Sequence, residues 1–485
     1  MLYRFSALIH RGFNSYSQSR QNGQIHLWLI SLIAIYTPFE DLIVAWLPLP
    51  NSAQTGLRFI PELTIYLIFI WVIGRRIVSG KGWQTTIIDP LVLAMAIATG
   101  ISILLNNSRL FPSLANLRSI WRYLALYYTI VNLPLAKSQV VQLLKIIKAV
   151  GFIQAAIASF QFFLPGKLKI ALAAGNCEKG AIKNASCGTF LDSANLSGFL
   201  LLVIGLVVSI VYVNCHYLVP PLRDVFSLGI YYFGMFASKK RAALLMSVFL
   251  IVLTLSFLKR FRNLRFLIWV LSALAIAVIF IYPLLSLDLD IGQREVGEEV
   301  PNITSYFLSV FSPEYWEHTL SASRGWVVTK VIQTSWESSS WFGFGPDHET
   351  LITNMGQFIT SDEVKKLVRD MEVFDDPYWF AYMGYFGIVG LLINWFILLR
   401  LFQAGRELLR ITAVKDYQIL AISFCSLIVV AFFYSFVERV FKLRHFSFYF
   451  WLLAGLVVNV YQSQIYKLRN SQINTDKFGT RRPED

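Results

Sequence analysis

The stretch Ala194-Asn-Leu-Ser-Gly-Phe-Leu-Leu-Leu-Val-Ile-Gly-Leu-Val-Val-Ser-Ile-Val-Tyr-Val213 contains no charged residue. A helix of about 20 mostly apolar residues spans the hydrocarbon core of a bilayer. Further stretches of this kind lie near 27–46, 59–74, 87–105, 117–133, 141–164, 224–237, 242–258, 266–285, 378–400, 417–437 and 446–463. The sequence therefore predicts an all-α, polytopic transmembrane helical bundle of about twelve spans.

The composition of the whole chain agrees with this class. Of its 485 residues, 56% are hydrophobic and 15% are charged, whereas soluble domains carry about 25% charged residues. A secreted mini-domain, a collagenous chain and a disordered chain are excluded. Lys and Arg outnumber Asp and Glu by 43 to 29, but in a membrane protein this excess is interpreted by side of the membrane. We therefore expect no nucleic-acid partner.

An even number of spans places both termini on one face of the membrane. The arginines and lysines of the short loops favour the cytoplasm for that face. The first predicted span along the chain, at 27–46, has no small-residue cleavage site, which favours a retained span over a removable signal peptide. The predicted parts are a cytoplasmic arm (1–26), helices 1–9 (27–285), a large outer loop (286–377), helices 10–12 (378–463) and a cytoplasmic tail (464–485).

The outer loop is rich in acidic residues and has helix signals of its own. Thr360 and Glu363 form a capping-box pattern, which predicts a helix through Glu372. A second helix is expected from Ser323 to Glu337. Loops of this length are usually functional or disordered, and the aromatic residues and capping signals favour a folded lid.

Basic residues collect at the predicted outer ends of spans, against the orientation rule. Each cluster by itself is explained as well by contact with lipid headgroups. Together, three clusters on one face favour a shared anionic ligand, and a phosphate suits Arg and Lys donors. The clusters are Arg118 and Arg122; Lys239, Lys240 and Arg241; and Arg439, Lys442 and Arg444.

Cys177 and Cys187 share one predicted outer loop, where a disulfide suits the oxidising side of the membrane. Two free thiols are the alternative. The chain has no CxxC pair, HExxH motif, P-loop or GxGxxG motif. We therefore expect neither a metal site nor a nucleotide cofactor.

Three patterns in order resemble the O-antigen ligase and polymerase superfamily. The members of this superfamily are membrane glycosyltransferases that use undecaprenyl-pyrophosphate-linked glycans. The first pattern is Gly188-Thr-Phe-Leu-Asp-Ser-Ala-Asn195, which leads into a span. The second is Ser238-Lys-Lys-Arg241-Ala-Ala at a helix start. The third is Ser323-Arg-Gly-Trp326, followed by Trp341-Phe-Gly-Phe-Gly-Pro346 and by Tyr385-Phe-Gly-Ile-Val-Gly390.

The resemblance implies a bacterial inner-membrane enzyme whose large loop is periplasmic. The activity would be that of an inverting, metal-independent glycosyltransferase. Its partners would be a lipid-pyrophosphate glycan donor, a glycan or lipid acceptor and the bilayer. Polymerisation of polysaccharide repeat units is the first expectation, with a chain-length regulator as a further partner. Ligation to lipid A-core is the second.

Such a transfer needs cations that stabilise the pyrophosphate as it leaves. Arg324 and Arg241 match arginines of the family motifs. A salt bridge within the acidic loop is the alternative role for Arg324. The other expected pyrophosphate ligands are Lys239, Lys240, Arg118, Arg122 and Arg444.

The transfer also needs a base for the acceptor hydroxyl. Eleven residues before Gly387, where the family has a histidine, this chain has Asp376, next to Asp375. His348 is the third candidate, because the pKa of histidine lies near neutrality. The alternatives are a helix cap for the two aspartates and an ordinary loop position for His348. The absent histidine counts against the ligase expectation.

A polytopic transporter or flippase of lipid-linked oligosaccharides is the rival from another class. Transporters often have internal repeats and ionisable residues at mid-membrane depth. The sequence shows no repeat, and the single large loop at 286–377 breaks a two-half pattern. The enzyme interpretation is therefore preferred.

Overall fold

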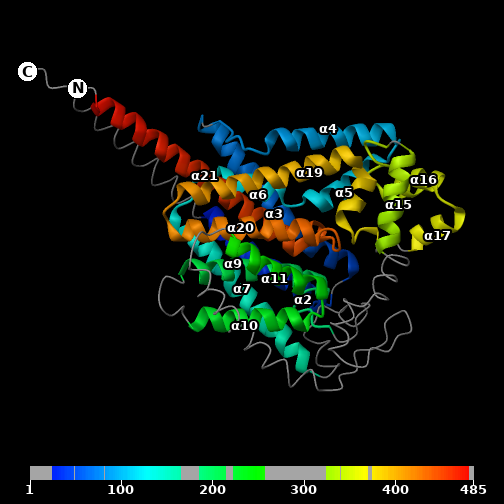
Figure 1. Ribbon diagram of the computed structural model, residues 1–485, viewed down its shortest axis with the longest axis horizontal. Helices are drawn as coiled ribbons and strands as arrows, with labels where there is room; N and C mark the ends of the chain where they lie inside the picture. Colours follow the sequence, from blue (N-terminus) through cyan, green and yellow to red (C-terminus); the bar gives the residue numbers. More distant parts are fainter. Residues whose placement is uncertain are drawn as a thin grey trace, which may run out of the picture.

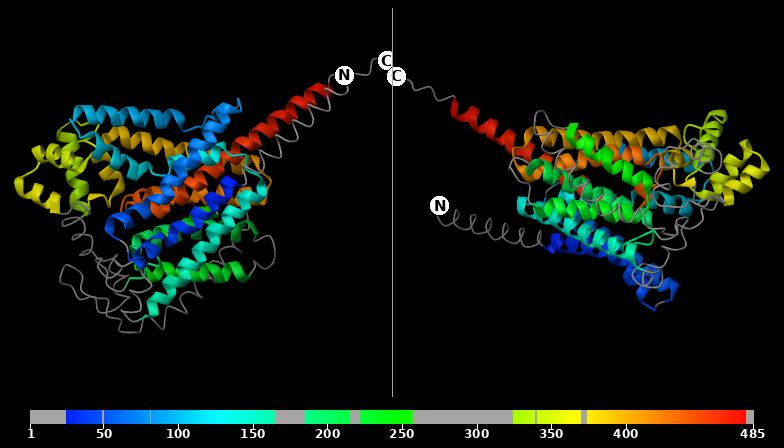
Figure 2. Two further views of the ribbon diagram at one scale, coloured as in Figure 1. Left: turned by 180° about the vertical axis from the view of Figure 1, so that it is seen from behind. Right: turned by 60° about the horizontal axis from the view of Figure 1, so that its bottom comes forward.

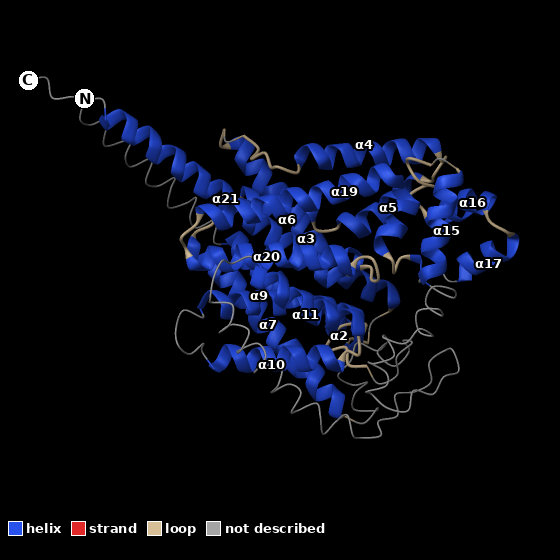
Figure 3. Ribbon diagram, in the orientation of Figure 1, coloured by secondary structure: helices blue, strands red, loops and turns tan. Residues whose placement is uncertain are grey.

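The computed structural model describes residues 25–48, 50–80, 82–164, 185–214, 222–256, 324–338, 340–369 and 374–479. Every regular element in these ranges is a helix (Figure 3). The predicted span at 266–285 and Cys177 lie outside the described residues. The all-α prediction is thus confirmed for the part of the chain that can be described.

In the N-terminal half, a helix over 25–36 continues through η1 (Thr37–Phe39) into α2 (Glu40–Trp46). The helices that follow are α3 (Asn51–Val78), α4 (Asp89–Leu105), α5 (Leu110–Trp121), α6 (Leu124–Asn132), α7 (Lys137–Phe163), α9 (Ser193–Asn214), α10 (Leu222–Ala237) and α11 (Arg241–Ser256).

In the C-terminal half, three helices precede the last long ones. The elements are α15 (Arg324–Glu337), α16 (His348–Met355), η3 (Gly356–Phe358), α17 (Ser361–Arg369), α19 (Tyr378–Ile411), α20 (Lys415–Tyr434), η4 (Val440–Lys442) and α21 (Arg444–Gly479). The Thr360–Glu363 capping box is present, with the backbone N–H of Thr360 donating to Glu363 over 2.9 Å.

The long helices form an antiparallel bundle, and α15, α16 and α17 gather at one end of it (Figures 1 and 2). We call this the loop end. The other end carries His26, whose ring lies 6.5 Å from that of Trp71, and the middle of α21, where Gln84 contacts Gln462. We call it the terminal end. The start of the first helix and the C-terminal part of α21 therefore lie on the same side, opposite the loop end.

Among the described residues, seven helices are long and apolar enough to cross a membrane: Ile25–Trp46, Ser52–Val78, Lys137–Phe163, Ser193–Asn214, Tyr378–Ile411, Lys415–Tyr434 and Arg444–Arg469. Asp89–Leu105 and Arg241–Thr254 are shorter apolar helices. The predicted span at 117–133 is instead two helices, because α5 ends at Trp121 and α6 begins at Leu124. The count of twelve spans stays a prediction.

Helix α9 is the centre of the bundle. In its most apolar window, 94% of the residues are buried inside the protein, compared with 28% for the peripheral α3. Helices α7, α10, α11, α20 and α21 pack around it. A helix that is apolar on all faces needs such a surrounding or a membrane, and here neighbouring helices supply it.

A break in α19 connects the bundle to the loop end. Gly387 has φ 70° and ψ −174°, a backbone region that is essentially restricted to glycine. The turn of the Gly-x-Gly motif packs against this break. The N–H of Phe344 donates to the Gly384 carbonyl over 2.8 Å, and the N–H of Val389 donates to the Trp341 carbonyl over 3.2 Å. The Trp341–Pro346 and Tyr385–Gly390 parts of the third sequence pattern thus pack against each other.

We expect Gly387→Ala to lower the free energy of unfolding by at least about 2 kcal/mol. A Cβ at Gly387 would lie 2.1 Å from the Trp341 carbonyl oxygen, and the backbone conformation itself penalises alanine. Gly229→Ala in α10 is the control, since a Cβ there meets nothing within 4 Å. Thermal unfolding of the full chain in detergent measures both variants. Equal melting temperatures would contradict the assignment.

Candidate functional site

A cavity of about 650 Å³ lies at the loop end of the bundle. Its lining includes five cationic side chains from three separate segments of the chain: Arg58, Arg122, Arg439, Lys442 and Arg444. Three carboxylates, those of Asp41, Asp192 and Asp375, line it as well. With both lining histidines neutral, five positive and three negative charges give the lining a net charge of +2. An anionic ligand is therefore favoured.

Carboxylates behind the lining hold the arginines in place. Nε of Arg122 lies 2.6 Å from Glu62, and Nη1 of Arg444 lies 2.7 Å from Glu40. Glu62 and Glu40 are buried and do not line the cavity. Because a guanidinium has five N–H donors, Arg122 keeps terminal donors for a ligand after pairing with Glu62. The ion pairs therefore fix the positions of the cations without closing the site.

A hydrogen-bonded chain of side chains lies at the rim of this cavity. Nζ of Lys442 donates to Asp375 over 2.7 Å, and the hydroxyl of Tyr385 donates to the same Asp375 oxygen over 3.1 Å. The Tyr385 oxygen lies 2.8 Å from Nδ1 of His348. Two of the three base candidates, His348 and Asp375, are thus joined through a tyrosine that comes from α19.

These hydrogen bonds determine the tautomer of the His348 imidazole. The single Tyr385 proton goes to Oδ1 of Asp375, which also accepts from Nζ of Lys442. The tyrosine oxygen then accepts a hydrogen bond from His348, so the proton of the neutral imidazole is on Nδ1. Within the described part of the chain, no other residue bonds Nε2. That nitrogen is left as a proton acceptor at the cavity.

Burial sets the protonation of the two basic members. It lowers the pKa of His348 below its ordinary value; Lys442 acts in the same direction, and Asp375 and Asp347 oppose it. Burial also lowers the pKa of Lys442, against the raising effect of Asp375. A neutral His348 at pH 7 follows, as a general base requires.

Asp376 belongs to an adjoining ion-pair network. Arg324 donates to its carboxylate from Nη2 over 2.6 Å and from Nε over 3.1 Å, and Nε of Arg439 lies 3.7 Å away. Nζ of Lys240 lies 3.4 Å from Glu438 in the same network. The helix-cap alternative for the aspartates is not observed, since no side chain caps α19. The salt-bridge alternative for Arg324 is observed, since Arg324 pairs with Asp376.

The network divides its charge unevenly between the two carboxyls. Burial and the neighbouring Glu438 raise the pKa of Asp376 despite Arg324 and Arg439. Burial also raises the pKa of Glu438, but Lys240, Arg324 and Arg439 outweigh it, so that this pKa lies below its ordinary value. Asp376 is therefore the member that takes up a proton first.

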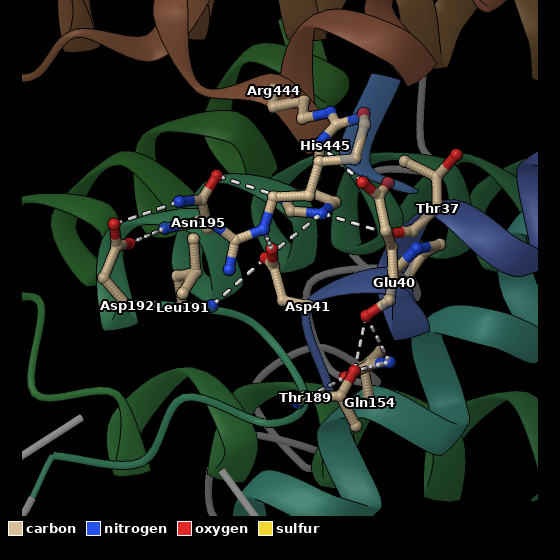
Figure 4. Close-up of polar contacts among 12 residues, drawn as sticks. Thr37, Glu40, Asp41, Gln154, Thr189, Leu191, Asp192, Asn195, Arg444 and His445 are labelled. Carbon is tan, nitrogen blue, oxygen red and sulfur yellow. Dashed lines mark hydrogen bonds and ion pairs between the residues drawn. The ribbon is translucent and has the colours of Figure 1, made fainter. Parts of the chain in front are cut away.

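The Gly188–Asn195 motif contributes Leu191, Asp192 and Asn195 to the cavity lining, and Figure 4 shows its polar contacts. The N–H of Thr189 donates to Gln154 over 3.1 Å, and the N–H of Leu191 donates to Asp41 over 3.3 Å. Asn195 lies 3.1 Å from Nδ1 of His445, whose Nε2 lies 3.1 Å from the Thr37 carbonyl. The motif thus joins α7, α2 and the start of α21.

The structure brings some of the expected ligands together and separates others. Arg122, Arg444, His348 and Asp375 line the cavity, and Arg324, Lys240 and Asp376 form the adjoining network. Arg118, Lys239 and Arg241 do not line the cavity. Arg118 pairs with Glu62 and lies over the ring of Phe59, while Lys239 is buried. Cys187 is disulfide-bonded, but its expected pairing with Cys177 stays a prediction.

Sequence reasoning missed several residues of the cavity. Arg58 and His445 lie within apolar helices, and Tyr385 resembles one more aromatic residue at a membrane interface. Lys442 belonged to an expected cluster but was not selected as a ligand, and Arg439 was expected to be a weaker one. The available signal was their spacing: Arg439, Lys442 and Arg444 precede a span in a segment that contains only one acidic residue nearby, Glu438.

Comparison with models of known protein families and with curated protein sequences finds no match for this chain. The family resemblance therefore rests on the short sequence motifs alone.

Lys442 and Asp375 should be energetically coupled, because both side chains are largely buried, with exposed fractions of 9% and 15%. We expect Lys442→Met and Asp375→Asn each to lower the free energy of unfolding by about 3 kcal/mol. The double variant should recover about 2 kcal/mol relative to the sum. The measurement is a double-mutant cycle on unfolding in mixed micelles.

The exposed pair of Arg410 and Glu407 is the matched control for this cycle. Its coupling should stay below about 0.5 kcal/mol. Strict additivity at Lys442 and Asp375 would show that the two side chains do not form the pair.

Proposed function

We propose that the chain is a membrane glycosyltransferase acting on undecaprenyl-pyrophosphate-linked glycan at the periplasmic face of a bacterial inner membrane. Polymerisation of repeat units is the first choice, and ligation to a lipid A-core acceptor is the second. The observation that carries the proposal is the cavity in which Arg122, Arg439, Lys442 and Arg444 meet beside His348.

The proposed orientation of the chain in the membrane is supported by features at the two ends of the bundle. The loop end lies opposite the start of the first helix and the C-terminal part of α21, and the disulfide-bonded Cys187 precedes the loop-end start of α9. Disulfides belong to the oxidising side. Arg75 and Arg76 near the end of α3 belong to the terminal end, as cytoplasmic basic residues do. These features support cytoplasmic termini and a periplasmic loop.

In the proposed reaction, Nε2 of His348 takes the proton of the acceptor hydroxyl. The acceptor oxygen forms a bond to the anomeric carbon from the side opposite the phosphate, so the configuration inverts. The bond between that carbon and the pyrophosphate oxygen breaks, and undecaprenyl pyrophosphate leaves with the electron pair. Arg122, Arg439 and Lys442 stabilise the charge that develops on it. Tyr385 and Asp375 are positioning residues that hold the imidazole.

Asp376 and Arg324 have a supporting role in this proposal. Arg324 holds Asp376, which in turn lies beside Arg439. The pair therefore positions a cation of the cavity and contacts the pyrophosphate only if Asp376 releases Arg324. Arg241 and Lys239, which do not line the cavity, are expected to contribute less.

The test is a reconstituted assay with the full chain, purified lipid-pyrophosphate repeat unit and no ATP. We expect a ladder of longer glycans from a polymerase, and transfer to added lipid A-core from a ligase. Arg122→Ala with Arg439→Ala should lower kcat/KM by about 100-fold or more, because charge stabilisation is lost at the leaving group. Arg410→Ala, an exposed position near the terminal end, is the control.

Full turnover in the double variant would remove the cavity from the mechanism. Movement of the intact lipid across a vesicle membrane, with no glycosidic bond formed, would favour the flippase instead.

The pH dependence of the rate tests His348 separately. Because burial lowers its pKa below about 6.5, the imidazole is neutral above that pH. Activity should therefore be flat near pH 7 and fall as the pH drops through the lowered pKa. His348→Gln should lower kcat by roughly 100-fold or more and abolish this acidic limb. An unchanged acidic limb in the variant would assign the base to another group.

A further inference from the structure

A second cavity, of about 290 Å³, lies between the end of α4, the end of α15 and the segment from α16 to η3. Its lining contains Asn, Gln, Ser, Phe and Leu side chains and no charged one. This composition differs sharply from that of the cationic cavity, which collects five basic residues. A different kind of ligand is indicated.

Two asparagines build the wall of this second cavity. Nδ2 of Asn106 donates to the carbonyls of Ser102 and Gly343 over 2.9 and 3.1 Å. Nδ2 of Asn354 donates to the Phe344 carbonyl over 3.0 Å and to Oδ1 of Asn106 over 3.1 Å. These bonds satisfy backbone groups of the Gly-x-Gly turn. They also fix the shape of the cavity before any ligand enters.

Other polar groups of the lining are left for a ligand. Asn107 and Gln357 are exposed, and neither side-chain amide has a hydrogen-bond partner within the described ranges. Oγ of Ser338 is buried without a partner there. A buried hydroxyl without a partner is costly, so a ligand that bonds it is favoured. Each free amide supplies both donors and an acceptor.

An aromatic surface completes the lining. Phe358 is 39% exposed, and its ring centroid lies 6.2 Å from that of the buried Phe344. An exposed ring beside free amides and hydroxyls fits a molecule with an apolar face and many hydroxyl groups. A charged ligand would lose its hydration here without gaining a counter-ion. Neutral saccharide is the chemical class that matches.

The two cavities are joined by α16. His348, the first residue of this helix, lines the cationic cavity, and Asn354, near its end, lines the second one. Six residues of helix cover about 9 Å. We infer that the second cavity is a subsite for neutral sugar units of the glycan whose diphosphate end occupies the cationic cavity. The inference rests on the proposed function and adds a second point of attachment to it.

The test compares two probes on the full chain in detergent by calorimetric titration. One is the repeat-unit oligosaccharide freed from lipid and phosphate, and the other is undecaprenyl pyrophosphate without sugar. The variant Asn107→Asp with Gln357→Glu keeps the side-chain shapes but replaces amide donors by carboxylates. It should weaken oligosaccharide binding by roughly tenfold or more and leave undecaprenyl pyrophosphate binding unchanged.

The double variant Arg122→Ala with Arg439→Ala should give the opposite pattern, and Gln403→Glu in α19 is the control for an exposed amide near the terminal end. Melting temperatures verify that every variant is folded. Oligosaccharide affinity equal to wild type in the Asn107 and Gln357 variant, or no oligosaccharide binding by the wild type, would overturn the subsite. An undecaprenyl pyrophosphate affinity that is unchanged in the Arg122 and Arg439 double variant would instead contradict the proposed function.

Discussion

Cations at the end of an apolar bundle need carboxylates to hold them, and this constraint organises the loop end. An arginine in a desolvated position is stable only when it is paired and hydrogen-bonded. Arg122 has Glu62, Arg444 has Glu40 and Lys442 has Asp375. Each pair joins segments that are distant in the chain. The same contacts that make the cavity cationic therefore also hold the end of α5 to α3, α21 to α2, and η4 to the segment before α19.

The second organising contact is made by backbone alone. The turn at Gly343 fits against the break at Gly387, and a Cβ at either glycine would collide with backbone atoms of the other segment. This contact brings α16 to the bundle and places His348 beside Tyr385. The position of the proposed base thus depends on glycines that have no chemistry of their own. Some motif residues therefore act by letting backbone segments pack closely, and others act through their charge.

Hydropathy predicted the helices well because a bilayer or a helical interior demands long apolar segments. It failed at 117–133, where α5 and α6 meet near Arg122, since an average over apolar residues does not detect a break. It also placed the ends of helices too early. Helix α19 continues to Ile411, and α21 to Gly479, because backbone hydrogen bonding persists into polar sequence. Charge clustering indicated the loop end of the bundle but did not select which of its cations share a cavity.

The sequence by itself determined the all-helical class, the apolar segments, the basic clusters beside them and the two aspartates before α19. These features are local, since each depends on residue types within a single segment. Only the tertiary structure decided which cations share a cavity, that Tyr385 connects His348 to Asp375, and that Arg324 is held by Asp376. Those outcomes depend on distances between segments that lie tens to hundreds of residues apart. No local pattern encodes such distances, because they follow from how whole helices pack.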